Sequence, residues 1–331
     1  MHPVVVHLAS GQAFFSGMAA VLVAILLTFR PWQSFRSSTD RTSPARRVRN
    51  LPALLSLIGL FLVILSGTPT PMPLLVLWGL SFCAWLLVLI WPVRPDRPRH
   101  RLERIIPGIL LGVSLLAAAW ELPYRFSPTL TPVRERGFTL IADSLSAGLG
   151  EQESTTWPNL LERRHGLKVE DWSRQGETVA SALKRAPVEG VTTPLVVLEI
   201  GGNDLLGPTT DTAFESGLDA LLTFARKGDD RGDRQLVMFE LPLPPFRQNV
   251  GAIQRRLARK HNVRLIPKSV LLGVVAGADA TVDGLHLSQS GHERMAAEVW
   301  SIIGPAFGPD APPVASVAGR RRSETNPLRQ P

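Results

Sequence analysis

The stretch GFTLIADSLSAG, residues 137–148, decides the fold assignment for the second part of this chain. Residues 138–142 form a short apolar run with the length of a buried strand. Asp143 and Ser144 follow at once, and Gly148 lets the chain turn. A serine at the end of a strand can keep its hydroxyl exposed and its backbone N–H free, as a nucleophile requires. Taken alone, the stretch also fits an ordinary strand-to-loop turn, because Ser and Asp are common turn residues.

Strands and helices are predicted to alternate through the rest of this part. Apolar runs predict strands at 169–172, 195–200, 235–241 and 263–267, and apolar residues at helical spacing predict helices at 157–165, 177–186, 211–226, 248–261 and 288–303. This alternation predicts an α/β domain with a parallel sheet covered on both faces. Ligands bind beyond the carboxyl ends of such strands. Ser144, Gly176 and Asn203 each come soon after a predicted strand, so we expect them to meet at one edge of the sheet.

Two acid–base residues stand near the end of the domain, in Asp283-Gly284-Leu285-His286. A carboxylate at this spacing can orient the imidazole, which could then take the proton of Ser144. The developing oxyanion would need donors, and the backbone N–H groups of Ser144 and Gly176 and the Asn203 amide are candidates. Taken alone, the Asp-x-x-His pair also fits an incidental loop or a metal site. No accompanying His or Cys cluster has ligand spacing, so we expect no metal and no organic cofactor.

Four blocks in order resemble the SGNH (GDSL-type) hydrolases: ADSLS at 142–146, SRQGET at 173–178, GGND at 201–204 and DGLH at 283–286. They look most like the branch of thioesterase I, lysophospholipase L1 and arylesterase. The resemblance covers about residues 138–304 and implies a flavodoxin-like three-layer fold. It also implies that Ser144 is the nucleophile, His286 the base and Asp283 its orienting partner, with Ser144, Gly176 and Asn203 as the oxyanion hole. Ala142 departs from the family, which usually has Gly there; a methyl group fits if φ is negative.

The first 122 residues contain four apolar runs of 16–19 residues, at 13–29, 51–66, 73–91 and 105–122. About 20 residues cross a hydrocarbon core of roughly 30 Å, so we expect four transmembrane helices. The second run is the shortest and needs flanking residues or a thinner bilayer to span. Residues 123–137, with Pro123, Pro128 and Pro132, are predicted to be a stiff linker, and residues 305–331 a disordered tail.

Basic charge is concentrated in this first part. Residues 1–122 contain 11 Arg, no Lys and 4 acidic residues, a net charge of +7, whereas the remainder carries +1. The arginines fall in the first and third connections between the apolar runs, which places those connections in the cytoplasm. Both termini and the α/β domain are then extracytoplasmic, on the periplasmic side of the inner membrane. The same bias explains the sequence pI of 10.6 without a nucleic-acid partner.

These observations together predict a membrane-anchored serine esterase that contacts membrane lipids. It is expected to hydrolyse carboxylic esters (acyl esters, lysophospholipids or thioesters) on the extracytoplasmic side, through an acyl-enzyme on Ser144, with a lipid or an acylated glycan as the substrate. Two alternatives stay open. One is transfer or removal of acyl or acetyl groups on an envelope glycan, which needs the same serine chemistry. The other is a non-catalytic envelope interaction module that keeps the fold alone.

Overall fold

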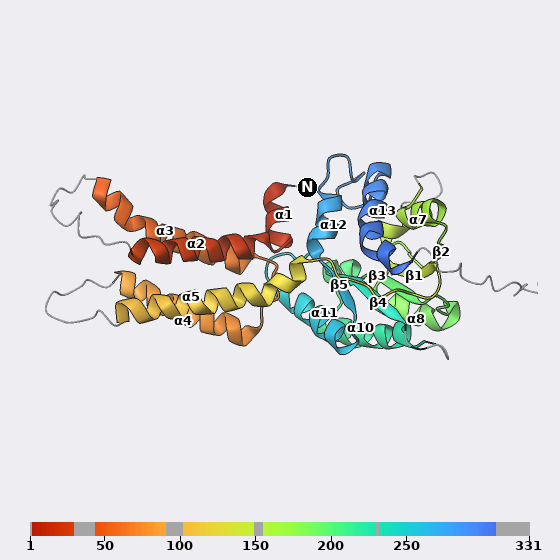
Figure 1. Cartoon of the computed structure of the whole chain (residues 1–331), viewed down its shortest axis with the longest axis horizontal. Coiled ribbons are helices and arrows are strands. Elements are labelled where there is room, and N and C mark those ends of the chain that lie inside the picture. The colour runs from red at the N-terminus through yellow and green to blue at the C-terminus, as the bar shows by residue number, and fades with distance from the viewer. Residues whose placement is uncertain are drawn as a thin grey trace, which may run out of the picture.

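The computed structural model describes residues 2–29, 44–90, 102–148, 155–228, 232 and 234–308. Within them, an elongated helical region is followed by an α/β domain (Figure 1). The arginine-rich connections fall largely at residues 30–43 and 91–101, and most of the predicted tail falls at 309–331. These segments lie outside the described residues.

The α/β domain is built on five parallel strands: β1 Gly137–Ala142, β2 Lys168–Asp171, β3 Leu195–Glu199, β4 Gln235–Phe239 and β5 Arg264–Ile266. Their order in the sheet is β2-β1-β3-β4-β5, and each neighbouring pair is parallel. β1 and β3 are buried throughout, as expected for strands covered on both faces. The predicted parallel α/β sheet is therefore confirmed.

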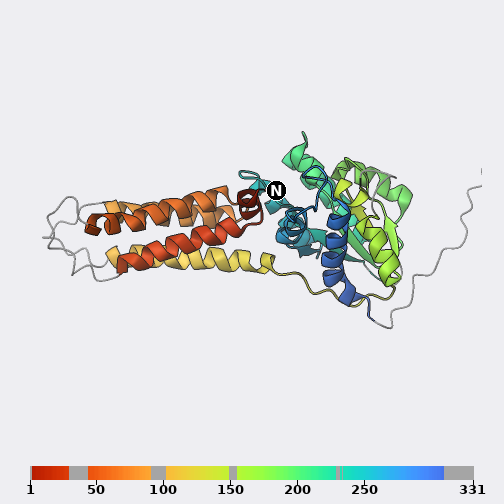
Figure 2. The same ribbon diagram turned by 90° about the horizontal axis from the view of Figure 1, so that it is seen from above.

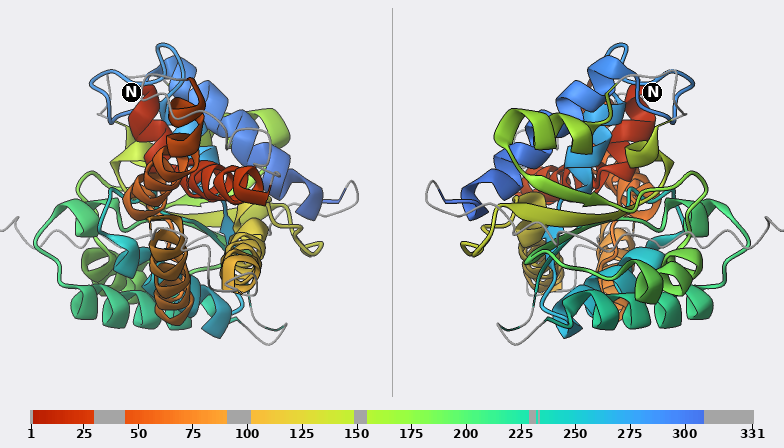
Figure 3. Two further views of the ribbon diagram at one scale, coloured as in Figure 1. Left: turned by 90° about the vertical axis from the view of Figure 1, so that its left-hand side faces the viewer. Right: turned by 90° about the vertical axis from the view of Figure 1, so that its right-hand side faces the viewer.

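Helices cover both faces of this sheet (Figure 3). On one face lie α7 Trp157–His165, α12 Lys268–Val275 and α13 Gln289–Ile303, which pack on Phe138 and Leu140 of β1. On the other lie α8 Val179–Glu189, α10 Asp211–Arg226 and α11 Gln248–Lys260, which pack on Val196 and Leu198 of β3. This arrangement leaves the carboxyl ends of the strands as the free edge.

Three helices of this domain were not predicted. α6 Ser144–Ala147 and α9 Gly202–Leu206 are single turns that follow β1 and β3. α12 has a nearly continuous apolar sequence, KSVLLGVV, so it carries little periodicity from which to recognise a helix. Its lysine, Lys268, is also buried.

The helical region consists of α1 Pro3–Ala9, α2 Gln12–Phe29, α3 Pro44–Leu65, α4 Met72–Ile90 and α5 Leu102–Glu121, and a 3₁₀ turn at Leu122–Arg125 follows. The last four helices run side by side (Figures 1 and 2). α2 and α3 approach closely at two glycines: a methyl group on Gly17 would lie 2.6 Å from the carbonyl oxygen of Gly59. Trp78 of α4 donates to Ser114 of α5 at 3.0 Å. Close contact through small residues is typical of helices packed in membranes.

Two of these helices, at 72–89 and 104–125, are long and apolar enough to cross a membrane. α1 and α2 together add a third if the pair, bent by 83°, is one span. The apolar part of α3, Leu51–Leu65, is shorter. The structure thus supports a membrane-associated region with two or three candidate spans among the described residues, fewer than the four predicted.

A buried cluster of charged residues joins the helical region to the α/β domain. Arg255 of α11 donates through both terminal nitrogens to Glu121 at the end of α5, at 2.6 and 2.7 Å, and through Nε to Glu240 at 2.6 Å. Its guanidinium stacks on Tyr124, 3.6 Å from the ring centre. Lys268 Nζ donates to Gly67 O, in the connection between α3 and α4, at 2.5 Å. We call Glu121, Tyr124, Glu240, Arg255 and Lys268 the junction cluster.

The predicted linker runs along the α/β domain instead of standing away from it. Leu130 is buried in the core, Thr131 hydrogen-bonds to Gln235, and the Val133 N–H donates to Ala306 O at 2.9 Å. Ala306 and Phe307 are also buried in that core. Residues 305–308, assigned to a disordered tail from the sequence, are therefore packed against the domain.

Candidate active site

Ser144 lies directly beyond β1, at the first position of α6. Asp143 extends the pairing with β3, since its N–H donates to Glu199 O at 3.1 Å, and its Oδ1 accepts from the Leu145 N–H at 3.0 Å. The Ser144 N–H therefore belongs to the first turn of a helix, where backbone donors lack an intrahelical acceptor. Ala142 has no positive φ, so its methyl group is accommodated without backbone strain.

Gly176 lies in the turn that follows β2. Its φ of 68° is left-handed, which explains the glycine. The Arg174 N–H donates to Ala142 O at 3.1 Å, and the Gln175 amide donates to Gly148 O at 3.0 Å. These bonds hold the turn beside the end of β1. A methyl group on Gly176 would meet no heavy atom within 4 Å, so this side of the turn is open.

Asn203 follows β3 and ties the other two segments together. Its Nδ2 donates to Glu177 O, next to Gly176, at 2.9 Å, and lies 3.4 Å from Asp143 Oδ2, next to Ser144. Gly202 permits this approach, because a methyl group there would come within 3.1 Å of Asp143 Oδ2. The ends of three strands thus meet at one amide group.

His286 and Asp283 form a compact pair in the loop between α12 and α13. His286 Nδ1 lies 2.6 Å from Asp283 Oδ2, and Asp283 Oδ1 accepts from the N–H groups of Leu285 and His286 at 2.9 and 2.8 Å. The backbone N–H of His286, followed by its side chain, holds the pKa of Asp283 well below its ordinary value. Asp283 therefore stays ionised and orients the imidazole, leaving Nε2 for another partner.

His286 faces the Ser144 corner of the domain. Burial raises the pKa of Asp143, the residue before Ser144, and the charge of His286 opposes part of that rise, so the two groups are close. Within the described part of the chain, however, no hydrogen bond joins Ser144 Oγ to His286. Such bonds are often long or misaligned in enzymes without substrate and tighten in the complex.

Asp143 and Glu199 form a buried pair of carboxyl groups next to the serine, which was not predicted from the sequence. Burial raises the pKa of Asp143 to about 6. Burial, and then the charge of Asp143, raises the pKa of Glu199 well above its ordinary value. Glu199 also accepts from Ser146 Oγ at 3.0 Å. The pair retains protons to higher pH than free carboxyl groups do, which limits the negative charge next to Ser144. The available signal was a glutamate inside the apolar run LVVLEI.

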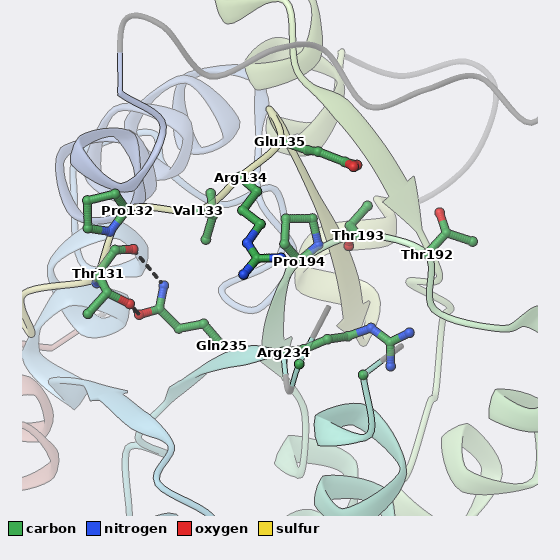
Figure 4. Close-up of a pocket in the computed structure, with 12 residues that line it drawn as sticks. Thr131, Pro132, Val133, Arg134, Glu135, Thr192, Thr193, Pro194, Arg234 and Gln235 are labelled. Carbon is green, nitrogen blue, oxygen red and sulfur yellow. Dashed lines mark hydrogen bonds between the residues drawn. The ribbon is translucent and has the colours of Figure 1, made fainter. Parts of the chain in front are cut away.

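A pocket of about 220 Å³ lies at the opposite edge of the sheet (Figure 4). Its lining includes Arg134, Thr192, Thr193, Arg234 and Gln235, at the amino ends of β1, β3 and β4. It is separate from the Ser144 edge. Among the described residues, no group of three or more His, Cys, Asp and Glu side chains is placed to hold a metal ion.

The family match found by comparison with known proteins lies in the α/β domain. Residues 143–294 match the GDSL-like Lipase/Acylhydrolase family. Esterase TesA of Pseudomonas aeruginosa is 27% identical over 180 residues, covering 50% of this chain and 87% of the relative. Thioesterase 1/protease 1/lysophospholipase L1 of Escherichia coli K12 is 29% identical over 159 residues, covering 45% of this chain and 74% of the relative. A crystal structure of TesA aligns with a TM-score of 0.45 at 27% identity, over 52% of this chain and 99% of that one.

The four blocks noted in the sequence all fall within or at the edge of the matched segment, on a parallel α/β sheet. The α/β domain of this chain belongs to the GDSL-like lipase/acylhydrolase family and is a serine ester hydrolase.

Proposed function

We propose that the ester is cleaved by Ser144, with His286 as general base and Asp283 as the residue that orients it. The observation that carries the proposal is the meeting of three strand ends at the Asn203 amide, together with an imidazole that is bonded to a carboxylate and is close enough for its charge to act on Asp143. The names of the relatives suggest acyl esters, thioesters or lysophospholipids as substrates.

In the proposed mechanism, His286 Nε2 removes the Ser144 proton as Oγ attacks the ester carbonyl carbon. The ester C–O bond then breaks, and the leaving oxygen takes the proton from the imidazolium. Water, deprotonated by the same imidazole, attacks the acyl-enzyme and releases the acid and Ser144. Asp283 stabilises the imidazolium in both halves because it remains ionised.

Three donors would bind the oxyanion: the N–H groups of Ser144 and Gly176 and Nδ2 of Asn203. Asn203 uses one amide hydrogen on Glu177 O at 2.9 Å, which fixes its side chain. The second amide hydrogen points toward Asp143, where Nδ2 and Oδ2 are 3.4 Å apart. A hydrogen bond of that length is weak, so the side chain loses little stabilisation when this hydrogen bonds to the substrate instead.

Asn203→Ala is expected to lower kcat for a p-nitrophenyl ester by about 10²–10³-fold with little change in KM, because the lost bond forms mainly in the transition state. Steady-state kinetics of the purified full chain measures both constants. Gln175→Ala is the matched control, since it removes an amide that holds the same site but no oxyanion donor. An equal loss of kcat in both variants would assign the effect to disturbed loops.

We also propose that α2–α5 all span the cytoplasmic membrane, so that residues 1–122 form a four-helix membrane region. Large apolar side chains cover the outside of the bundle, including Leu57, Phe61, Leu80, Leu87 and Leu116. Such exposure suits contact with lipid and not with water. α3 contributes to this surface, which supports it as the fourth span despite its short apolar part.

The arginine-rich connections support a cytoplasmic location for residues 30–43 and 91–101 and a periplasmic one for the hydrolase. In a Cys83→Ser background, a membrane-impermeant maleimide is expected to label Lys184→Cys in intact spheroplasts, but Ser38→Cys only after lysis. Labelling of Ser38→Cys before lysis, with Lys184→Cys protected, would reverse the orientation.

A further inference from the structure

Six apolar side chains are exposed on segments that adjoin either the candidate active site or the membrane helices. Leu206 ends α9, three residues beyond Asn203; Val282 and Leu285 flank the Asp283–His286 pair; Phe246 follows β4; and two more lie on α1. We call Val4, Val5, Leu206, Phe246, Val282 and Leu285 the apolar rim. Leu206 and Phe246 are 73% and 70% exposed, and grouped exposure of apolar side chains marks interaction sites for proteins or membranes.

Contacts with the helical region place this rim near the ends of the membrane helices. Gln248, two residues after Phe246, donates to Ser66 O at 3.1 Å, and a methyl group on Gly67 would collide with Leu243 O. α1 packs on α12, which leads into the loop that holds Val282 and Leu285. Asn249 Nδ2 lies 3.4 Å from Asp211, which links the Phe246 segment to the start of α10, close to Leu206.

The orientation of the rim is fixed by the junction cluster and by α1. Arg255 binds Glu121 and Glu240, and all three residues are buried. These bonds restrict rotation of the α/β domain relative to α5. α1 turns by 83° from α2, and therefore lies across the direction of the spans, as an interfacial helix does. Its exposed Val4 and Val5 continue the apolar surface.

The backbone at Phe246 adds independent support. Its φ is 67°, a conformation that is an outlier for a bulky residue. Strain of this kind persists where the surrounding structure enforces it and is concentrated at functional positions. Here it holds an aromatic ring outward, beside the membrane helices.

We propose that the apolar rim docks into the outer surface of the same bilayer that holds α2–α5, so that the candidate active site opens at the lipid interface and receives esters held in the leaflet. The proposal rests on the proposed function, because it requires the spans and the Ser144 site. It adds the binding surface: the bilayer is its partner, and an acyl chain in the leaflet enters without first crossing water.

Fluorescence quenching tests the docking without any enzyme assay. In a Cys83→Ser background, an environment-sensitive dye is attached to Phe246→Cys or Val282→Cys in the full chain, reconstituted in phosphatidylcholine–phosphatidylglycerol nanodiscs. Val188→Cys is the control, because Val188 is 88% exposed on α8, far from the bundle (Figure 1). Nitroxide-headgroup lipids are expected to quench the first two at least about twofold and leave Val188 unchanged. Equal quenching at all three positions, or quenching that follows the number of chains per disc, overturns the proposal.

Enzyme kinetics then distinguishes an error in the rim proposal from an error in the proposed hydrolase function. Val5→Gln/Phe246→Gln is expected to keep kcat/KM for a soluble short-chain ester within about twofold and to lower the rate on a long-chain ester in the bilayer at least tenfold. Val188→Gln should change neither rate. An equal loss on both esters overturns the rim proposal. Wild-type protein inactive on every ester would contradict the proposed function, whereas the quenching result would still decide the docking.

Discussion

Replacing Ser144 by alanine is expected to lower kcat/KM for a p-nitrophenyl ester by about 10⁴–10⁶-fold, the scale on which loss of a serine nucleophile acts. The reason is that the acyl-enzyme can no longer form, while the donors of the oxyanion hole remain. A fluorophosphonate should add its mass to wild-type protein on the peptide containing Ser144 and leave the variant unmodified.

Ser216→Ala is the control for this result, because Ser216 is exposed on α10 and its hydroxyl donates to Ala213 O of the same helix. It should retain full activity and full labelling. Ester hydrolysis by Ser144→Ala within tenfold of wild type, or continued labelling, would show that another residue is the nucleophile.

The largest effect on stability is expected from Arg255→Met. The change leaves Glu121 and Glu240 buried without the guanidinium that bonds both of them, and breaking such a pair on one side costs about 3–5 kcal/mol. At about 2–4 °C per kcal/mol for a domain of this size, the unfolding temperature should fall by roughly 10 °C. Tryptophan fluorescence during heating in detergent measures it.

Arg256→Met provides the comparison within the same helix. Arg256 pairs with Glu215 at the surface, where an ion pair contributes about 0–1 kcal/mol, so its loss should shift the midpoint by only a few degrees. The triple change Glu121→Gln/Glu240→Gln/Arg255→Met removes all three charges and should recover much of the loss. Equal destabilisation by Arg255→Met and Arg256→Met would show that the junction cluster does not hold the two regions together.

The local sequence pattern was enough to predict the sheet and all of its covering helices except α12. The helix at 211–226 was predicted with the bounds that α10 has, because its apolar face recurs at helical spacing. The strand at 195–200 was recognisable because β3 is buried on both faces and reads as one apolar run. α12 has no polar face to mark its period, which explains why it was missed.

Part of the candidate site could be predicted from the sequence, because the carboxyl ends of parallel strands lie at one edge of the sheet. Ser144, Gly176 and Asn203 follow the ends of β1, β2 and β3, and the Asp283–His286 contact is local. Contacts between residues that are far apart in the sequence produce no local sequence pattern from which they could be predicted. Glu121 and Arg255 are 134 residues apart, and nothing near either residue indicates the other. The Asp143–Glu199 pair also depends on adjacent strands, so it emerged only from the sheet.

The packed linker determines where a water-soluble fragment of the hydrolase can be cut. A fragment that begins at Phe138 would lack Leu130, which fills part of the core, and the Thr131 contacts with Gln235. One that stops at Gly304 would lack Phe307 and the carbonyl of Ala306 that receives the Val133 N–H. Any cut between Glu121 and Leu130 removes the Glu121 partner of Arg255 and leaves Glu240 as its remaining carboxylate. A fragment with boundaries near residues 126 and 308 retains Leu130, Ala306 and Phe307 in the hydrophobic core and the Arg255–Glu240 ion pair. Such a fragment suits crystallisation without detergent.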